Sequence, residues 1–220
     1  SYEQNHTYLS DDEVASMLGN YQYIDFTEQK IRAICLNTSE TTKDISSGES
    51  ISEGISGKQL EWFASALDVS KKSNGIIILS HHPLDWGKLL PAANCLQAYI
   101  NGEVFSITHD GMDIEYDFSG RNRATIIAQF HGHVHNYKVD YIHYRSSEGE
   151  ILQTTVKRIA IPNTNFYRNN EYGSDSGTEY YGIEFGETVT YNKEYENAKD
   201  TAFSAITIDK SSKKIYVYNY

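Results

Sequence analysis

The stretch IIILSHHPL, Ile76–Leu84, runs from four apolar residues through Ser80 into a pair of histidines and a proline. The apolar run follows Asn74-Gly75, a turn signal, and predicts a short buried strand at Ile76–Leu79. A second stretch repeats the arrangement: RATIIAQF predicts a buried strand and leads directly into HGHVHNY. Each strand therefore delivers histidines at its C-terminal end.

The elements around these two strands alternate between strands and helices, which is typical of an α/β fold whose site lies where the strands end. A short helix at Asp11–Gly19 and a long loop at Asn165–Tyr195 are also expected. The remaining elements that the patterns predict are a hairpin at Tyr21–Phe26 and Ile31–Asn37, a helix capped by Ser56 over 56–70, a helix from Ala92 to Gly102, a strand at Lys157–Ile161 and a closing hairpin at Ala202–Ile208 and Lys214–Tyr220.

The composition is that of a globular protein with an acidic surface. The 220 residues carry a formal net charge of -11, which argues against broad binding to nucleic acid or to anionic membranes. No apolar run is long enough to cross a bilayer, and the start of the chain has no signal-peptide pattern. The sequence therefore does not indicate the cellular compartment of the protein. Two cysteines, Cys35 and Cys95, make no metal knuckle and are expected to be buried thiols. Because the chain begins without Met and ends within a predicted strand, we expect a fragment of a longer protein.

The histidines of both loops are candidates for metal binding, because neutral imidazole is the commonest protein ligand for borderline ions such as zinc, iron and manganese. Gly132 is expected to allow a tight turn that directs His133 and His135 toward different ions. Three further histidines, His6, His109 and His143, are expected to lie on the surface or in ordinary hydrogen bonds.

SHHPL followed by FHGHVHNY resembles the C-terminal half of the calcineurin-like metallophosphoesterases, whose last two conserved blocks are Gly-His-x-Pro and Gly-His-x-His. KIRAICLNTSE, ISGKQLEWFASAL and the closing hairpin are also similar to that family, most of all to its phage- or prophage-associated members. The resemblance implies a sandwich of two mixed β-sheets flanked by helices. Residues 1–220 would be the C-terminal portion of that single domain, with its N-terminal part missing.

The resemblance also implies a function and a ligand set. The intact protein would hydrolyse a phosphomonoester or phosphodiester at a binuclear centre of two divalent ions of the Mn, Fe or Zn type. His81 and His133 would bind one ion, and His135 would bind the other. His82 would line the pocket or pack near Pro83, and His131 would have no ligand role.

Three blocks of the family pattern are absent from this sequence: Asp-x-His, Gly-Asp-x-x-Asp and Gly-Asn-His-Asp. A two-metal centre needs an anionic bridge between its ions, which three imidazoles do not supply. We therefore expect this chain alone to be inactive or nearly so, and its partner to be the missing N-terminal segment of the same protein.

Two other interpretations remain open. The chain could be an inactive scaffold or binding module of a phage-related protein. It could also hold a single zinc ion with the same histidines and a carboxylate such as Asp85 or Asp140. We expect four arginines mainly to form surface ion pairs: Arg32, Arg121, Arg123 and Arg158. Asn37 is expected to cap a turn. The pattern does not indicate which phosphoester is the substrate.

Overall fold

The computed structural model describes residues 21–40, 42–43, 50–51, 54–69, 75–133, 138–161, 178–184, 187–193, 204–209 and 211–219. The expected helix at Asp11–Gly19, His6 and His135 lie outside these ranges. The chain forms two compact units, of which the larger contains a six-stranded sheet and the smaller a four-stranded sheet. The expectation that residues 1–220 form one domain stays a prediction.

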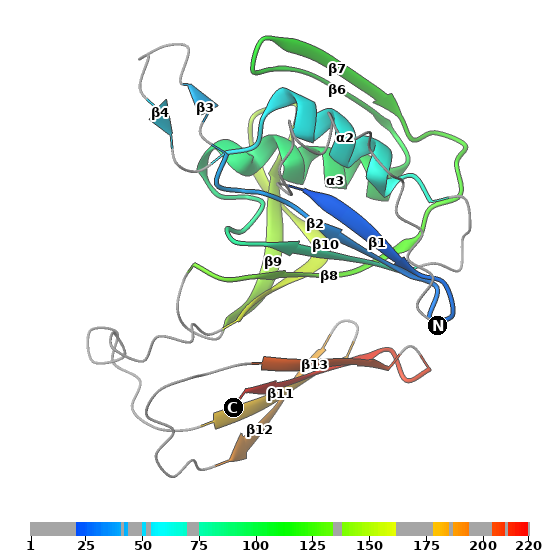
Figure 1. The fold of residues 1–220 in the computed structure, drawn as a ribbon, viewed down its shortest axis with the longest axis vertical. Helices are drawn as coiled ribbons and strands as arrows, with labels where there is room; N and C mark the ends of the chain where they lie inside the picture. The colour runs from blue at the N-terminus through cyan, green and yellow to red at the C-terminus, as the bar shows by residue number, and fades with distance from the viewer. Residues whose placement is uncertain are drawn as a thin grey trace, which may run out of the picture. The chain divides into compact units, whose positions relative to one another are not determined.

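The larger unit is built on a mixed sheet with the strand order β1-β2-β5-β8-β10-β9 (Figure 1). β1 and β2 form the expected antiparallel hairpin, whereas β2, β5 and β8 run parallel to one another. The α/β class predicted from the alternation of elements is therefore confirmed. The strands are β1 (Gln22–Phe26), β2 (Ile31–Cys35), β5 (Gly75–Ser80), β8 (Thr125–His131), β9 (Lys138–Arg145) and β10 (Ile151–Ala160).

The two strands that precede the histidines lie side by side inside this sheet, flanked by β2 and β10. In β5 the expected burial holds fully for one face only: Ile76 and Ile78 are completely buried, whereas Ile77 and Leu79, which point to the other face, are half-buried. The strand expected at Lys157–Ile161 is the end of the longer strand β10.

Helix α2 (Gly57–Leu67) begins where the sequence predicted, because Ser56 is its N-cap and the Ser56 side chain accepts a hydrogen bond from the Gln59 backbone N–H at 3.2 Å. Leu60 and Phe63, spaced three residues apart on its apolar face, are completely buried. They belong to one core that also contains Ile34, Ile76, Ile78, Leu89, Leu96, Tyr99 and Phe118.

Helix α3 (Leu90–Asn101) begins two residues before the expected Ala92 and directly follows a short 3₁₀ helix, Gly87–Leu89. Pro91 fits in its first turn, where a missing backbone N–H costs no helical hydrogen bond. The helix ends at Gly102, whose φ of 72° is the left-handed conformation expected of a C-terminal glycine. Figure 1 shows α2 and α3 on the same face of the sheet. No helix within the described ranges is both long and apolar enough to cross a membrane.

Two antiparallel hairpins accompany these helices. Strands β6 (Val104–His109) and β7 (Met112–Asp117) occupy a stretch of mixed sequence pattern, and they lie beyond α2 and α3 from the sheet (Figure 1). A short pair, β3 (Thr42–Lys43) and β4 (Ser50–Ile51), lies in the serine-rich segment 38–57.

The smaller unit contains a wholly antiparallel sheet with the order β12-β11-β14-β13. β13 (Ser204–Asp209) and β14 (Lys214–Asn219) are the expected closing hairpin. β11 (Thr178–Glu184) and β12 (Glu187–Lys193) fall within the segment expected to be a long loop, so that expectation was wrong there. The many polar residues of that segment obscured its strand pattern, since β pairing depends on the neighbouring strands more than on local propensity.

Candidate metal centre

The two histidine loops begin side by side at one edge of the six-stranded sheet. The last residue of β5, Ser80, is paired with the last residue of β8, His131. His81 is the first residue after one strand and His133 the second residue after the other. Because parallel strands end at the same edge of a sheet, this register is sufficient to bring the loops together.

Three imidazoles form a group at this edge. One nitrogen atom from each of His81, His82 and His133 lies within 4.8 Å of the other two. A tetrahedral ion with bonds of about 2.05 Å holds its ligand atoms about 3.3 Å apart, so sharing one ion needs only a small closing movement of these side chains. Imidazole donors fit zinc or iron better than manganese, which prefers oxygen. Among the residues that the structure describes, no carboxylate belongs to this group.

His82 is held on several sides. Its side chain is buried, and its backbone N–H donates to Thr38 Oγ1 at 2.9 Å. Its carbonyl oxygen accepts hydrogen bonds from Ser80 Oγ at 2.8 Å and from Gln129 Nε2 at 3.2 Å. Its ring atom Nδ1 lies 3.0 Å from the carbonyl oxygen of Thr38. The backbone and one ring nitrogen of His82 are therefore fixed by residues of three strand ends.

His81 and His133 are more accessible to solvent. The ring of His81 meets that of His82 edge to face, with 4.6 Å between the centroids. His133 has a φ of 66°, in the left-handed region that residues other than glycine seldom adopt. The turn that we expected from Gly132 therefore places the unusual conformation on His133 itself. Such backbone outliers tend to occur at functional sites.

The structure brings together two of the three histidines that the resemblance assigns as ligands, His81 and His133. His135 lies outside the described residues, so its assignment to a second ion stays a prediction. His82, which was expected only to line the pocket, is a member of the group. His131 is buried at the end of β8 and does not belong to the group found among the described residues.

The two carboxylates considered as ligands for a single zinc ion are both engaged by Arg158. Arg158 Nη2 contacts Asp140 Oδ2 at 2.9 Å, and closer contacts join the guanidinium to Asp85 and to Asp140 Oδ1. Asp85 Oδ2 also accepts the backbone N–H of His143 at 2.8 Å and lies 3.0 Å from His143 Nδ1. Asp85 and Asp140 thus serve as counter-ions of an arginine.

Arg158 keeps its charge in this network. Burial of the guanidinium lowers its pKa, but the hydrogen bond with Asp140 and the charges of Asp85 and Asp140 outweigh that effect, so the pKa lies above the ordinary value. The charged guanidinium of Arg158, in β10, therefore links Asp85, which follows the His81-His82 pair, to Asp140 of β9.

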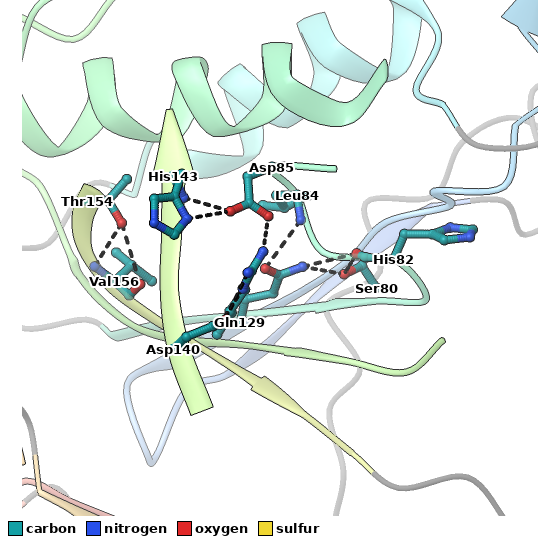
Figure 2. A network of polar contacts seen from close by, with 10 residues as sticks. Ser80, His82, Leu84, Asp85, Gln129, Asp140, His143, Thr154 and Val156 are labelled. Carbon is teal, nitrogen blue, oxygen red and sulfur yellow. Dashed lines mark hydrogen bonds and ion pairs between the residues drawn. The ribbon is translucent and has the colours of Figure 1, made fainter. Parts of the chain in front are cut away.

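Two polar residues that hold the histidine loops were not identified from the sequence, Thr38 and Gln129. Gln129 is completely buried in β8; its Nε2 donates to Ser80 Oγ at 2.7 Å and its Oε1 accepts the backbone N–H of Leu84 at 3.4 Å (Figure 2). A glutamine within an apolar strand is a usable signal, because a buried amide must find partners. Thr38, after the end of β2, carried no comparable signal.

The other candidate residues make structural contacts. Arg32 binds both oxygens of Asp25, Arg121 pairs with Asp68, Asn37 Oδ1 caps the backbone N–H of Ser39 at 3.0 Å, and His109 Nε2 lies 2.7 Å from the carbonyl oxygen of Ile55. Arg123 is exposed. Burial raises the pKa of the Cys35 and Cys95 thiols, in keeping with two unreactive cysteines.

Comparison of the chain with protein-family models found no match, and comparisons with curated proteins and with solved structures found none either.

Proposed function

We propose that this chain supplies the histidine side of a metal-dependent phosphoesterase centre. The observation that carries the proposal is the pairing of Ser80 with His131, which starts both histidine loops at the same edge of the sheet. Imidazoles from both loops then contribute to one group of three. An edge where parallel strands end is the usual place for a site in an α/β protein.

The role of each residue in this centre follows from its position. His81, His82 and His133 would hold a divalent ion, which when bound withdraws electron density from a phosphoryl oxygen of the substrate. All three are neutral ligands, so the loaded site keeps a positive charge that attracts an anionic phosphoester despite the acidic balance of the chain. The inner strands β5 and β8 give these side chains a rigid base.

The resemblance to the calcineurin-like metallophosphoesterases supports the choice of substrate and the second ion. In this proposal His135 serves that second ion, and the fold is the family's two-sheet sandwich, with the six-stranded mixed sheet as one of the sheets. Two dications close together need a carboxylate bridge, which the described histidine group does not contain. The bridge would come from a preceding segment of the same protein, so the present chain should turn over phosphoesters slowly or not at all.

An inactive scaffold or binding module is the second candidate. The observation that favours it is the same lack of a carboxylate in the histidine group within the described residues. A scaffold of this kind would keep the sheet and the loops but would have no need of a bound metal.

The test compares the present chain with a longer one that includes the segment encoded before Ser1. Metal content is measured by mass spectrometry after dialysis against Mn²⁺ or Zn²⁺, and hydrolysis is measured with bis(p-nitrophenyl) phosphate. We expect metal on both chains, turnover by the longer chain, and loss of that turnover in His133→Ala but not in His109→Gln. Robust turnover by the present chain, lost in His133→Ala, would contradict the division of ligands. A longer chain with neither metal nor turnover would establish the scaffold instead.

A further inference from the structure

We infer that His82, binding through Nε2, is the principal metal ligand of the His81-His82 loop, and that Thr38 is the residue that positions it. This inference rests on the proposed metal centre. It changes the assignment that the resemblance gives, in which the first histidine of the pair is the ligand and the second lines the pocket.

The contacts of the ring determine which nitrogen of His82 carries the proton. Nδ1 lies 3.0 Å from the carbonyl oxygen of Thr38 and 3.2 Å from its hydroxyl oxygen. A carbonyl oxygen only accepts hydrogen bonds, so Nδ1 must donate, and the neutral ring then has its lone pair on Nε2. A hydrogen bond from the second nitrogen to a backbone carbonyl is the usual way in which a protein fixes the tautomer of a metal-binding histidine.

The same threonine also fixes the backbone of His82. Thr38 Oγ1 accepts the His82 backbone N–H at 2.9 Å, and Thr38 is itself 1% exposed. The Thr38 carbonyl oxygen accepts a further hydrogen bond from Gly54 N–H at 3.1 Å, which holds it in place. Thr38 therefore determines both where His82 lies and how its ring is turned.

Burial adds a reason for ranking His82 above His81. His82 is 5% exposed, whereas His81 is exposed. An exposed ring must lose side-chain freedom when it binds an ion, but a ring that is already held in a single orientation loses little. His81 can still join as a further ligand, since one of its ring nitrogens lies within 4.8 Å of a ring nitrogen of His82.

The test measures Zn²⁺ affinity by isothermal titration calorimetry with asparagine variants of the two histidines. Asparagine places an amide N–H near the position of Nδ1, so His82→Asn keeps a donor for the Thr38 carbonyl but lacks Nε2. We expect the affinity to fall at least about tenfold in His82→Asn and by a smaller factor in the matched control His81→Asn. Thr38→Val, which removes the acceptor for the His82 N–H, should also weaken binding, and Thr38→Ser should restore it.

A second readout does not depend on the variants folding. Nitrogen-15 NMR of the wild-type histidine rings should show the proton of His82 on Nδ1 before zinc is added, and zinc should then shift the Nε2 signal. Zinc binding that is lost in His81→Asn and unchanged in His82→Asn would overturn the inference while leaving the proposed function intact. A proton on Nε2 of His82 would overturn it as well. A wild-type chain that binds no zinc would overturn both the inference and the proposed function.

Discussion

The guanidinium of Arg158 pairs with the carboxylate of Asp85, which lies 73 residues earlier in the chain and three residues after His82. The Asp85 side chain is 6% exposed, so this pair is largely removed from water. Replacing one member of a buried ion pair is more costly than losing a surface pair, because the remaining charge is left without compensation.

Arg158→Met should therefore destabilise the larger unit. We expect the free energy of unfolding, measured by urea denaturation, to fall by about 3 kcal/mol. The matched control is Arg121→Met, which also breaks an arginine–aspartate pair, but one in which the Arg121 side chain is 46% exposed and that of Asp68 is 25% exposed. That loss should be near 1 kcal/mol. Equal losses of unfolding free energy in the two variants would show that the ion pair of Arg158 with Asp85 stabilises the fold no more than a more exposed pair does.

The register of β5 and β8 leads to a prediction for His133. Ser80 and His131 are paired at the ends of β5 and β8, so His133 joins the histidine group from the loop after β8, whereas His81 and His82 come from the loop after β5. Removing the His133 ring therefore leaves the group with ligands from one loop only. His133→Ala should weaken Zn²⁺ binding by about tenfold or more. The control His109→Gln removes a histidine that contacts the Ile55 carbonyl, and it should bind zinc as the wild type does. An unchanged affinity in His133→Ala would exclude this histidine from the site.

The features that could be predicted from the sequence are those set by local pattern. The buried strands before His81 and His131, the Ser56 cap and the stop at Gly102 all depend on residues within one turn or one strand. The parallel order of the strands then predicted that the two loops would meet. The group formed by His81 and His133 follows from that reasoning and from the resemblance together.

The features that could not be predicted depend on contacts between distant segments. Thr38 orients His82 from 44 residues away, and Arg158 engages Asp85 from 73 residues away. No pattern near Thr38 or Asp85 indicates these partners, so the sequence alone does not show that His82 lies in the histidine group or that Asp85 pairs with Arg158. The strands β11 and β12 were missed for a similar reason, because their pairing with each other and with β14 is not encoded in local propensity.

A buried tyrosine provides a prediction on pH. The Tyr99 hydroxyl donates to the Ala124 carbonyl at 3.2 Å and accepts the Ala124 backbone N–H at 2.6 Å. Burial raises the pKa of Tyr99 to about 12, although the hydrogen bond to Ala124 acts in the opposite direction. An unfolded tyrosine ionises near pH 10, so the stabilisation by Tyr99 is complete below that pH and is lost as the pH rises toward 12.

The measurement compares the wild type with Tyr99→Phe by urea denaturation at several pH values. At pH 7 the variant should be less stable by about 1–3 kcal/mol, because the Ala124 N–H loses its acceptor. Between pH 10 and pH 12 the difference should shift against the wild type by up to ~3 kcal/mol, since only the wild type has this group to ionise. A difference that does not change over this range would contradict the raised pKa.

Trp86 should report metal binding directly. Its ring centroid lies 6.2 Å from that of His82, and it is 41% exposed. Its backbone is fixed on both sides, since Trp86 N–H donates to Pro83 and its carbonyl accepts the N–H of Leu89. A paramagnetic ion such as Cu²⁺ or Ni²⁺ held by His82 would therefore lie close enough to the indole to quench its fluorescence.

The second tryptophan, Trp62, provides the control, because its ring lies instead against Tyr21 and Tyr23, with centroids 4.7 and 6.2 Å away. We expect Ni²⁺ to quench the fluorescence of Trp62→Phe, in which Trp86 remains, and to leave that of Trp86→Phe nearly unchanged. Adding His82→Asn to Trp62→Phe should abolish the quenching at the same Ni²⁺ concentration. Quenching that persists in the variant without His82 would mean that the Ni²⁺ near Trp86 is bound by other residues and not by the histidine group.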